Sequence, residues 1–459
     1  MIKFIKSGMP YYKRMILIAL PIMIQNGITN FVSMLDNIMV GRVGTLEMTG
    51  VSIVNQLMLV FNLCIFGAMS GVGIFTAQFY GKKDGDGVKS TLQYKLVAAF
   101  LLTVVCLGIF LTIDEVLIGA YLKGEGSAED IALVMSYSKS YLKIMLIGTL
   151  PFAFSQAYAG TMRETSDRII PMVATVSAVL VNLVFNYFLI FGKFGFPEMG
   201  IDGAAIATVL SRLVELLILV IWAHTHKEKY SFIKGLFTDF TITGQLIKKI
   251  TIITLPLLIN EALWSGGMAM LNQCYSVRGL DVVAALNIVS TINNVFNVSF
   301  IAFGSAIGII LSQMLGAKQK EKAAHASERL LFFATAVVII IGAVMCAVAP
   351  LFPKIYNTTD EIRSIATSII IVVGCFMPVQ AFTNACYFTL RSGGKTVITF
   401  IFDSGFVWLI SVPLAFMLSR FTDMPIMYMY ACVLGADIIK CCLGYIFMKK
   451  GTWRNTVVD

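Results

Sequence analysis

Long apolar segments alternate with short polar ones along almost the whole chain. Twelve of these segments are long enough to cross a bilayer as an α-helix, because one span needs about 20 consecutive apolar residues. Their approximate bounds are residues 16–40, 51–79, 92–113, 137–160, 169–191, 203–223, 249–275, 283–313, 330–350, 364–390, 397–418 and 426–448. The pattern therefore predicts an all-α, polytopic membrane protein with 12 transmembrane helices.

The two halves of the chain resemble each other. A shift of 235 positions aligns Leu20-Pro21 with Leu255-Pro256, Asn37 with Asn272, Gln78 with Gln313 and Gly81 with Gly316. The repeat indicates a duplicated unit of six helices, and because six is even, both copies cross the membrane in the same direction. We expect two pseudo-symmetric six-helix lobes, residues 1–223 and 249–459, joined by a cytoplasmic linker at residues 224–248.

Charged residues add an orientation to this picture. Only 13% of the residues are charged, compared with roughly 25% in soluble proteins. The net charge of +9 arises from Lys and Arg residues that gather at the two termini and in the loops after spans two, four, six and eight. By the positive-inside rule these loops and both termini are cytoplasmic, so the charge is a topology signal and predicts no nucleic-acid partner.

The first span contains a carboxylate. Asp36 lies in a stripe of polar residues that recur every three to four positions and include Gln25 and Asn30. A charge at mid-span costs roughly 2.5 to 3.5 kcal/mol on insertion scales, which favours a functional acid facing an aqueous cavity. The alternative is an acid that reaches the outer interface near Arg42.

Polar residues of the fifth and sixth spans are expected at a similar depth. Asn182 and Asn186 are one helical turn apart, and Thr208 follows in the next span. Together with Asp36 they offer carboxylate, amide and hydroxyl oxygens, which are ligands for a hard cation such as Na⁺, while the carboxylate alone can bind a proton. The alternative is a cluster of interhelical hydrogen bonds.

The second half places its acids differently. Asn260 and Glu261 lie in span seven, and Asp403 lies in span eleven without an oppositely charged residue near it on the same helix. Asp403 is either a cavity acid or an interface residue. Two other pairs, Arg212 with Glu215 and Asp437 with Lys440, are three positions apart on a helix and are interpreted as local, structural charge neutralisation.

Several of these segments resemble the multidrug and toxic compound extrusion (MATE) family over essentially the whole chain. They are ALPIMIQNGITNFVSMLDNIMVGRVGTLEMTGVSIVNQL, GVGIFTAQFYGKKD, VNLVFNYFLIFG and GIDGAAIAT. The resemblance implies cation-coupled efflux of organic, often cationic, drugs. It assigns Asp36, Asn182, Asn186 and Thr208 to the cation site, although some members have Asp where this chain has Asn186.

For the second half, the resemblance implies a cavity acid at Glu261. An acid found on span ten of some members is absent, and Gln380 and Asn384 stand in that region. The expected substrate cavity therefore contains Glu261, Gln25, Asn30, Asn260, Gln380, Asn384 and Asp403.

The leading hypothesis is an antiporter that exchanges amphipathic organic cations for Na⁺ or H⁺ by alternating access. The alternatives are a lipid-linked oligosaccharide flippase of the same superfold and, from another class, an ion channel. No enzymatic activity is expected, because no catalytic constellation is present at usable spacing. We expect no cofactor, no metal other than Na⁺ at Asp36, a monomer, and a location in a prokaryotic inner membrane.

Overall fold

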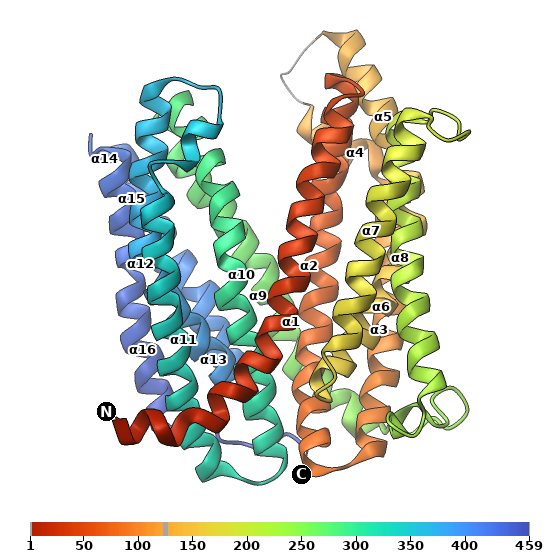
Figure 1. Cartoon of the computed structure of the whole chain (residues 1–459), viewed down its shortest axis with the longest axis vertical. Helices are drawn as coiled ribbons and strands as arrows, with labels where there is room; N and C mark the ends of the chain where they lie inside the picture. The colour runs from red at the N-terminus through yellow and green to blue at the C-terminus, as the bar shows by residue number, and fades with distance from the viewer. Residues whose placement is uncertain (1, 123–126, 459) are drawn as a thin grey trace. The chain divides into compact units, whose positions relative to one another are not determined.

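The computed structural model describes residues 2–122 and 127–458, with side chains from Ser7 onward, and every element in these ranges is helical. In unbroken order (Figure 1), the elements are α1 (Ile2–Gly41), α2 (Thr45–Lys82), α3 (Gly85–Thr112), α4 (Asp114–Tyr121), α5 (Ala128–Ile147), α6 (Thr149–Glu164), α7 (Ile169–Phe191), α8 (Gly200–Thr225), η1 (Ser231–Ile233), α9 (Gly244–Ser276), α10 (Leu280–Gly316), α11 (Lys320–Val348), η2 (Phe352–Ile355), α12 (Asp360–Ser392), α13 (Thr396–Phe400), η3 (Ile401–Gly405), η4 (Val407–Ser411), α14 (Val412–Phe421), α15 (Ile426–Gly435) and α16 (Asp437–Lys450).

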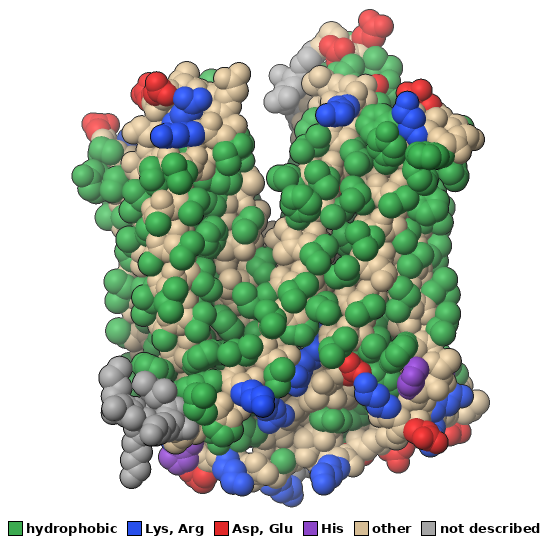
Figure 2. Space-filling model, in the orientation of Figure 1, with side chains coloured by type: hydrophobic (Ala, Val, Ile, Leu, Met, Phe, Trp, Pro, Cys, Tyr) green, Lys and Arg blue, Asp and Glu red, His purple; other side chains and the backbone are tan. Residues whose placement is uncertain are grey.

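Among the described residues, 10 stretches are long and apolar enough to cross a membrane. They coincide with ten of the predicted spans, and the all-α, multi-pass membrane fold is confirmed. The predicted span 137–160 is divided between α5 and α6 at Gly148, because Pro151 has no N–H to bond the carbonyl of Ile147. The predicted span 249–275 lies within α9, which carries Asn260 and Glu261 near its middle. Hydrophobic side chains cover the middle of the visible face of each compact unit, and most charged side chains lie toward its ends (Figure 2).

The helices form two compact units that exchange segments. The first unit contains Ile24–Thr76 and Asp84–Ile250, and the second contains Met1–Met23, Ala77–Lys83 and Thr251–Asp459. Helix α1 therefore passes from the second unit to the first two residues after Pro21, which lies inside it. The last turn and a half of α2 also belongs to the second unit. The lobe boundaries expected from the sequence stay a prediction.

The first unit is built around α7 and α8, which pack against each other along their lengths, with α5 and α6 packed on α8. Helix α3 packs on α6, and there Lys95 donates to Glu164 Oε2 at 2.5 Å and to Thr161 Oγ1 at 3.1 Å. Since Lys95 is fully buried, this ion pair satisfies a charge that would be costly to leave alone. The pair joins α3 to α6 within the unit.

The second unit is organised by α12, which packs on α10, α11, α15 and α16. Residues near both chain ends belong to this unit and lie at the same end of it (Figure 1). There the side chain of Gln78 donates to the carbonyl of Ser392 at 2.9 Å and accepts from the N–H of Val457 at 2.8 Å. The segment after α16 is thereby tied to the end of α2.

At the same end, the backbones of α2 and α10 touch through two glycines. A Cβ atom added to Gly81 would overlap the carbonyl group of Gln313, and one added to Gly316 would overlap the carbonyl group of Gln78. Gly81 and Gly316, like Gln78 and Gln313, are counterparts in the sequence repeat. The contact is therefore reciprocal, and it requires the smallest residue at both positions.

Two turns of π-helix, η3 and η4, replace α-helical geometry between α13 and α14. Pro413 follows directly after Val412 and cannot bond to the carbonyl of Leu409. The wider turns change the direction of the side chains along this segment. Asp403 lies in η3, and π-helical turns occur frequently at functional sites.

Candidate functional site

The four predicted cation ligands lie together in the first unit. Asp36 of α1 accepts a hydrogen bond from Asn186 Nδ2 of α7 at 2.7 Å. The side-chain amide of Asn182 lies 3.2 Å from Asn186 Nδ2 and 3.3 Å from Thr208 Oγ1 of α8. Asn186 is 1% exposed and Asn182 is 7% exposed, whereas Asp36 is half-buried. The carboxylate therefore points toward α7, and the ion pairs of the described residues do not join it to Arg42.

The amide of Asn182 also faces this carboxylate. Its nitrogen donates to Asp36 Oδ2 at 2.8 Å, and its oxygen accepts from Thr208 Oγ1 at 3.3 Å. Asn186 Oδ1 is buried and has no hydrogen-bond partner among the described residues. One amide oxygen of this cluster, that of Asn186, is thus without a donor among the described residues.

A second set of hydrogen bonds joins α1 to the interior of the same unit. Gln25 Nε2 donates to Thr175 Oγ1 at 2.9 Å, and Thr175 donates in turn to Glu215 Oε1 at 2.6 Å. Ser155 donates to the other oxygen of Glu215 at 3.4 Å. Glu215 is 7% exposed, so these hydroxyl groups partly replace its hydration. Gln25 is therefore held at this network, while Asn30 is exposed.

In the second unit, Asn260 and Asp403 are brought together and a third group joins them. Asn260 Nδ2 donates to Asp403 Oδ2 at 3.1 Å, and Lys440 Nζ of α16 donates to Asp403 Oδ1 at 2.8 Å. Asn260 Oδ1 accepts from the hydroxyl of Ser404 at 2.7 Å, which attaches η3 to α9. Tyr387 lies at the edge of this cluster, with its hydroxyl 3.5 Å from Asn260 Nδ2.

The other second-half residues that are expected in the substrate cavity lie elsewhere in this unit. Glu261 is half-buried and lies within electrostatic range of both Arg391 and Asp403. Gln380 is half-buried on α12. Asn384, one turn further along α12, lies against Gly304 of α10, and its Oδ1 is buried with no partner among the described residues.

The structure corrects the expected ion pair of Lys440 and adds an aromatic contact to Arg212. Lys440 makes its ion pair with Asp403 on another helix, whereas the sequence analysis paired it with Asp437 and left Asp403 without a partner. The reason is that η3 packs on α16 and brings Asp403 within 2.8 Å of the ammonium group. Arg212 places its guanidinium 5.1 Å from the ring centroid of Phe152, a contact that helix spacing does not predict.

Several other polar residues of these clusters were not predicted from the sequence. Thr175, Ser404 and Tyr387 give no signal by themselves, because isolated hydroxyl groups are common in membrane helices. The buried pair of Lys95 and Glu164 gave one usable signal, namely a lysine three residues inside an apolar segment. Among the described residues, no group of three or more His, Cys, Asp or Glu side chains could hold a metal ion.

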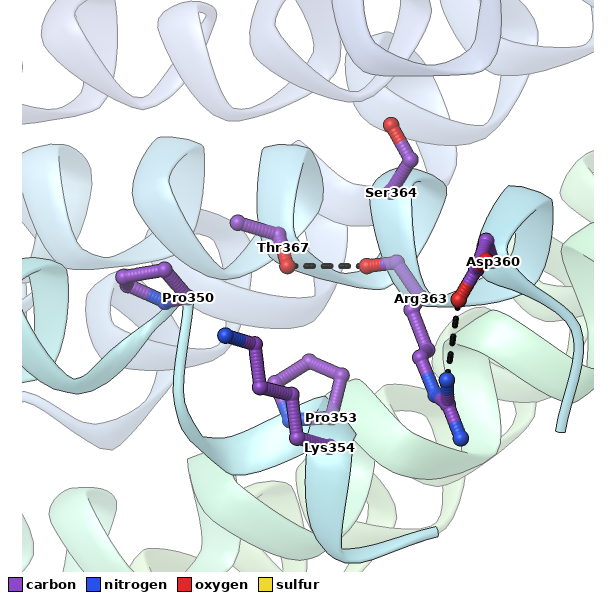
Figure 3. Close-up of a pocket in the computed structure, with 7 residues that line it drawn as sticks. All are labelled: Pro350, Pro353, Lys354, Asp360, Arg363, Ser364 and Thr367. Carbon is purple, nitrogen blue, oxygen red and sulfur yellow. Dashed lines mark hydrogen bonds and ion pairs between the residues drawn. The ribbon is translucent and has the colours of Figure 1, made fainter. Parts of the chain in front are cut away.

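A separate cavity of about 370 Å³ lies where η2 meets the start of α12 (Figure 3). Its lining residues are Pro350, Pro353, Lys354, Asp360, Arg363, Ser364 and Thr367. The guanidinium of Arg363 is held by Asp360 at 2.9 Å and by the carbonyl of Tyr356 at 3.0 Å. None of the predicted site residues lines this cavity, so the predicted site and the cavity are distinct.

Two bacterial relatives align with this chain over nearly its whole length. A probable multidrug resistance protein NorM of Thermotoga maritima is 26% identical over 449 residues, covering 97% of this chain and 94% of the relative. A probable multidrug resistance protein YoeA of Bacillus subtilis is 25% identical, covering 98% and 96%. The expected resemblance therefore extends along the full length of both proteins.

A solved structure described as the outward-facing conformation of a multidrug resistance MATE family transporter superimposes with a TM-score of 0.87. It is 18% identical and covers 96% of this chain and 95% of its own, so it supports the fold. The MatE family model matches residues 21–188 and again residues 256–417. The two matches begin 256 − 21 = 235 positions apart, which is the shift found in the sequence repeat. This chain therefore belongs to the MatE family, whose members are transporters and not enzymes, and is an integral, multi-pass membrane protein.

Proposed function

We propose that this chain is a secondary active antiporter of a bacterial cell membrane. It exports amphipathic organic cations, and the inward movement of Na⁺ or H⁺ through Asp36 drives the export by alternating access. The names of the full-length relatives, which are multidrug resistance proteins, support the organic substrate class. The same names do not favour the lipid-linked oligosaccharide flippase.

The observation that carries the proposal is the set of neutral ligands around Asp36. Asn182, Asn186 and Thr208 offer dipoles and no positive charge, so no described residue at this site supplies a cation to compensate the ionised carboxylate. An uncompensated charge inside a membrane protein is costly. Binding Na⁺ or a proton at Asp36 removes that cost, and amide and hydroxyl oxygens suit Na⁺.

The Asn182 amide nitrogen donates to Asp36 Oδ2 at 2.8 Å. A cation bound at Asp36 competes with this donor, so loading the site requires a local rearrangement of these hydrogen bonds. An ion changes a conformational equilibrium only through its differential affinity for the states, so this local rearrangement must be more favourable in one of them.

The decisive experiment is dye efflux from inverted vesicles with a Na⁺ gradient and a pH gradient imposed separately. We expect one gradient to drive export of an organic cation and Asp36→Asn to abolish it. The matched control is Asp86→Asn, which removes an exposed acid of the same unit. Gradient-driven export at the wild-type rate in Asp36→Asn would contradict the proposal.

A further inference from the structure

Lys440 occupies a small enclosure made of a carboxylate and two aromatic rings. Its ammonium group lies 2.8 Å from Asp403 Oδ1, 5.3 Å from the ring centroid of Phe402 and 5.9 Å from that of Phe406. Lys440 is 8% exposed, Phe402 4% and Phe406 5%. The lysine is therefore almost entirely removed from solvent, and its charge is satisfied by these groups.

The enclosure is held in place independently of the lysine. Ser404 donates to Asn260 Oδ1 at 2.7 Å and to the Asn260 carbonyl at 2.8 Å, which fixes η3 on α9. Asn260 also donates to Asp403 Oδ2 at 3.1 Å and so orients the carboxylate. The π-helical turn places Phe402 and Phe406 on either side of Asp403 in the sequence, facing the same ammonium group.

A carboxylate with aromatic faces is the chemistry that recognises alkylammonium ions, through charge attraction and cation–π contacts. The side chain of lysine ends as a primary alkylammonium ion, so Lys440 has the chemical form of a ligand for this enclosure. Asp403 is not sealed, since its side chain is 19% exposed, and Glu261 lies within electrostatic range of it.

We propose that Asp403, Phe402 and Phe406 form an alkylammonium site that Lys440 occupies as a tethered ligand. An exported organic ammonium ion exchanges with Lys440 there, and the return of Lys440 displaces the substrate. The proposal rests on the proposed function, because it names the substrate class and the means of its release. It requires the enclosure to hold one cation at a time.

The first test uses the native protein, so it does not depend on a variant folding. Purified protein is treated with an amine-reactive acetylating reagent, with and without saturating trimethylammonium, a tertiary ammonium ion that forms no stable amide with the reagent, and modification of each lysine is measured by mass spectrometry. We expect modification of Lys440 to rise at least fivefold when trimethylammonium is present. Modification of Lys449 should be unchanged, because its pair with Glu328 at 2.7 Å lies outside the enclosure on the same helix.

Two results of that experiment would overturn the proposal. One is unchanged modification of Lys440 at saturating trimethylammonium. The other is an equal rise with NaCl alone, which would assign the enclosure to an inorganic cation. Both readings are made without an ion gradient, so they are independent of whether Asp36 couples transport.

The second test measures n-butylammonium binding by titration calorimetry. Lys440→Ala removes the tethered ligand and leaves a space of matching shape, so binding should become at least tenfold tighter. Lys449→Ala is the matched control, because Lys449 also pairs with a carboxylate and lies 5.6 Å from the Tyr445 ring centroid. Equal affinity in the native protein and in Lys440→Ala would show that Lys440 is only structural.

Discussion

Each unit of the molecule contains a half-buried carboxylate, and the groups that contact the two carboxylates differ in charge. Among the described residues, Asp36 of the first unit has neutral partners, the amide of Asn186 at 2.7 Å and the Asn182 amide beside it. Asp403 of the second unit has the ammonium group of Lys440 at 2.8 Å. The carboxylate of the first site therefore still needs a cation to balance its charge, whereas the second site already contains one. This contrast separates a site for a coupling ion from a site for competition between cations.

The largest effect is expected at Asp36, because a change there tests most directly whether the two carboxylates have different functions. Asp36→Asn keeps the size of the side chain but removes the charge that an ion must neutralise. We expect export driven by the coupling ion to fall by at least a hundredfold, with unchanged expression and melting temperature. Initial rates of dye efflux measure the first quantity, and thermal unfolding of the purified protein measures the second.

Removing the acid of the second unit should instead damage stability. Asp403→Asn removes the carboxylate that pairs directly with the buried Lys440 ammonium group and leaves only the more distant charge of Asp437. Breaking a buried ion pair typically costs about 3 to 5 kcal/mol. The double change Asp403→Asn with Lys440→Met removes both charges and should recover most of that loss. Thermal unfolding of the three proteins provides the measurement. A single variant as stable as the wild type would show that the pair is not needed in the folded state.

Glu261 allows the comparison to be sharpened, because it belongs to the unit of Asp403 and lies within electrostatic range of Arg391. If it attracts substrate cations, Glu261→Gln should weaken binding of a cationic dye about tenfold, or roughly 1.4 kcal/mol, and leave a neutral dye of similar size unaffected. Equilibrium binding of the two dyes distinguishes these outcomes. An equal loss for both dyes would indicate that Glu261 only supports packing.

The smallest effect is expected at Asp167, a paired carboxylate of the first unit outside the spans. Its burial raises its pKa, but hydrogen bonds from Lys229, at 2.5 Å, and from Tyr230 outweigh that effect and hold the pKa below its usual range. A lowered pKa gives stabilisation that is present above the unfolded pKa of about 4 and is lost as the pH falls through the folded value.

Asp167→Asn should therefore reduce stability at pH 7 by less than about 1 kcal/mol, since Lys229 is solvent-exposed. Below the folded pKa the wild type and the variant should become equally stable. Unfolding midpoints of both proteins at pH 7 and near pH 3 provide the check. A difference that does not shrink in acid would mean that the ion pair contributes nothing.

How far the sequence predicts the site depends on the range of the interactions. The set around Asp36 was predicted, because helical spacing and span depth both place Asn182, Asn186 and Thr208 near it. The partner of Asp403 was not predicted, because the local rule of opposite charges three positions apart favours Asp437 for Lys440. Packing of η3 on α16 decides the pairing, and such contacts between distant segments leave no local pattern. The division of the span 137–160 at Gly148 has a local cause instead, because Pro151 cannot donate to the carbonyl of Ile147.

The reciprocal contact of α2 with α10 has a consequence for the history of the chain. Gly81 meets Gln313 while Gly316 meets Gln78, which is the rule for an interface between two identical subunits around a two-fold axis. A separate six-helix polypeptide could make the same contact twice by pairing with a second copy of itself. Fusion of two gene copies would then preserve an interface that already existed between two subunits. Each glycine would be retained because its half of that interface leaves no space for a side chain.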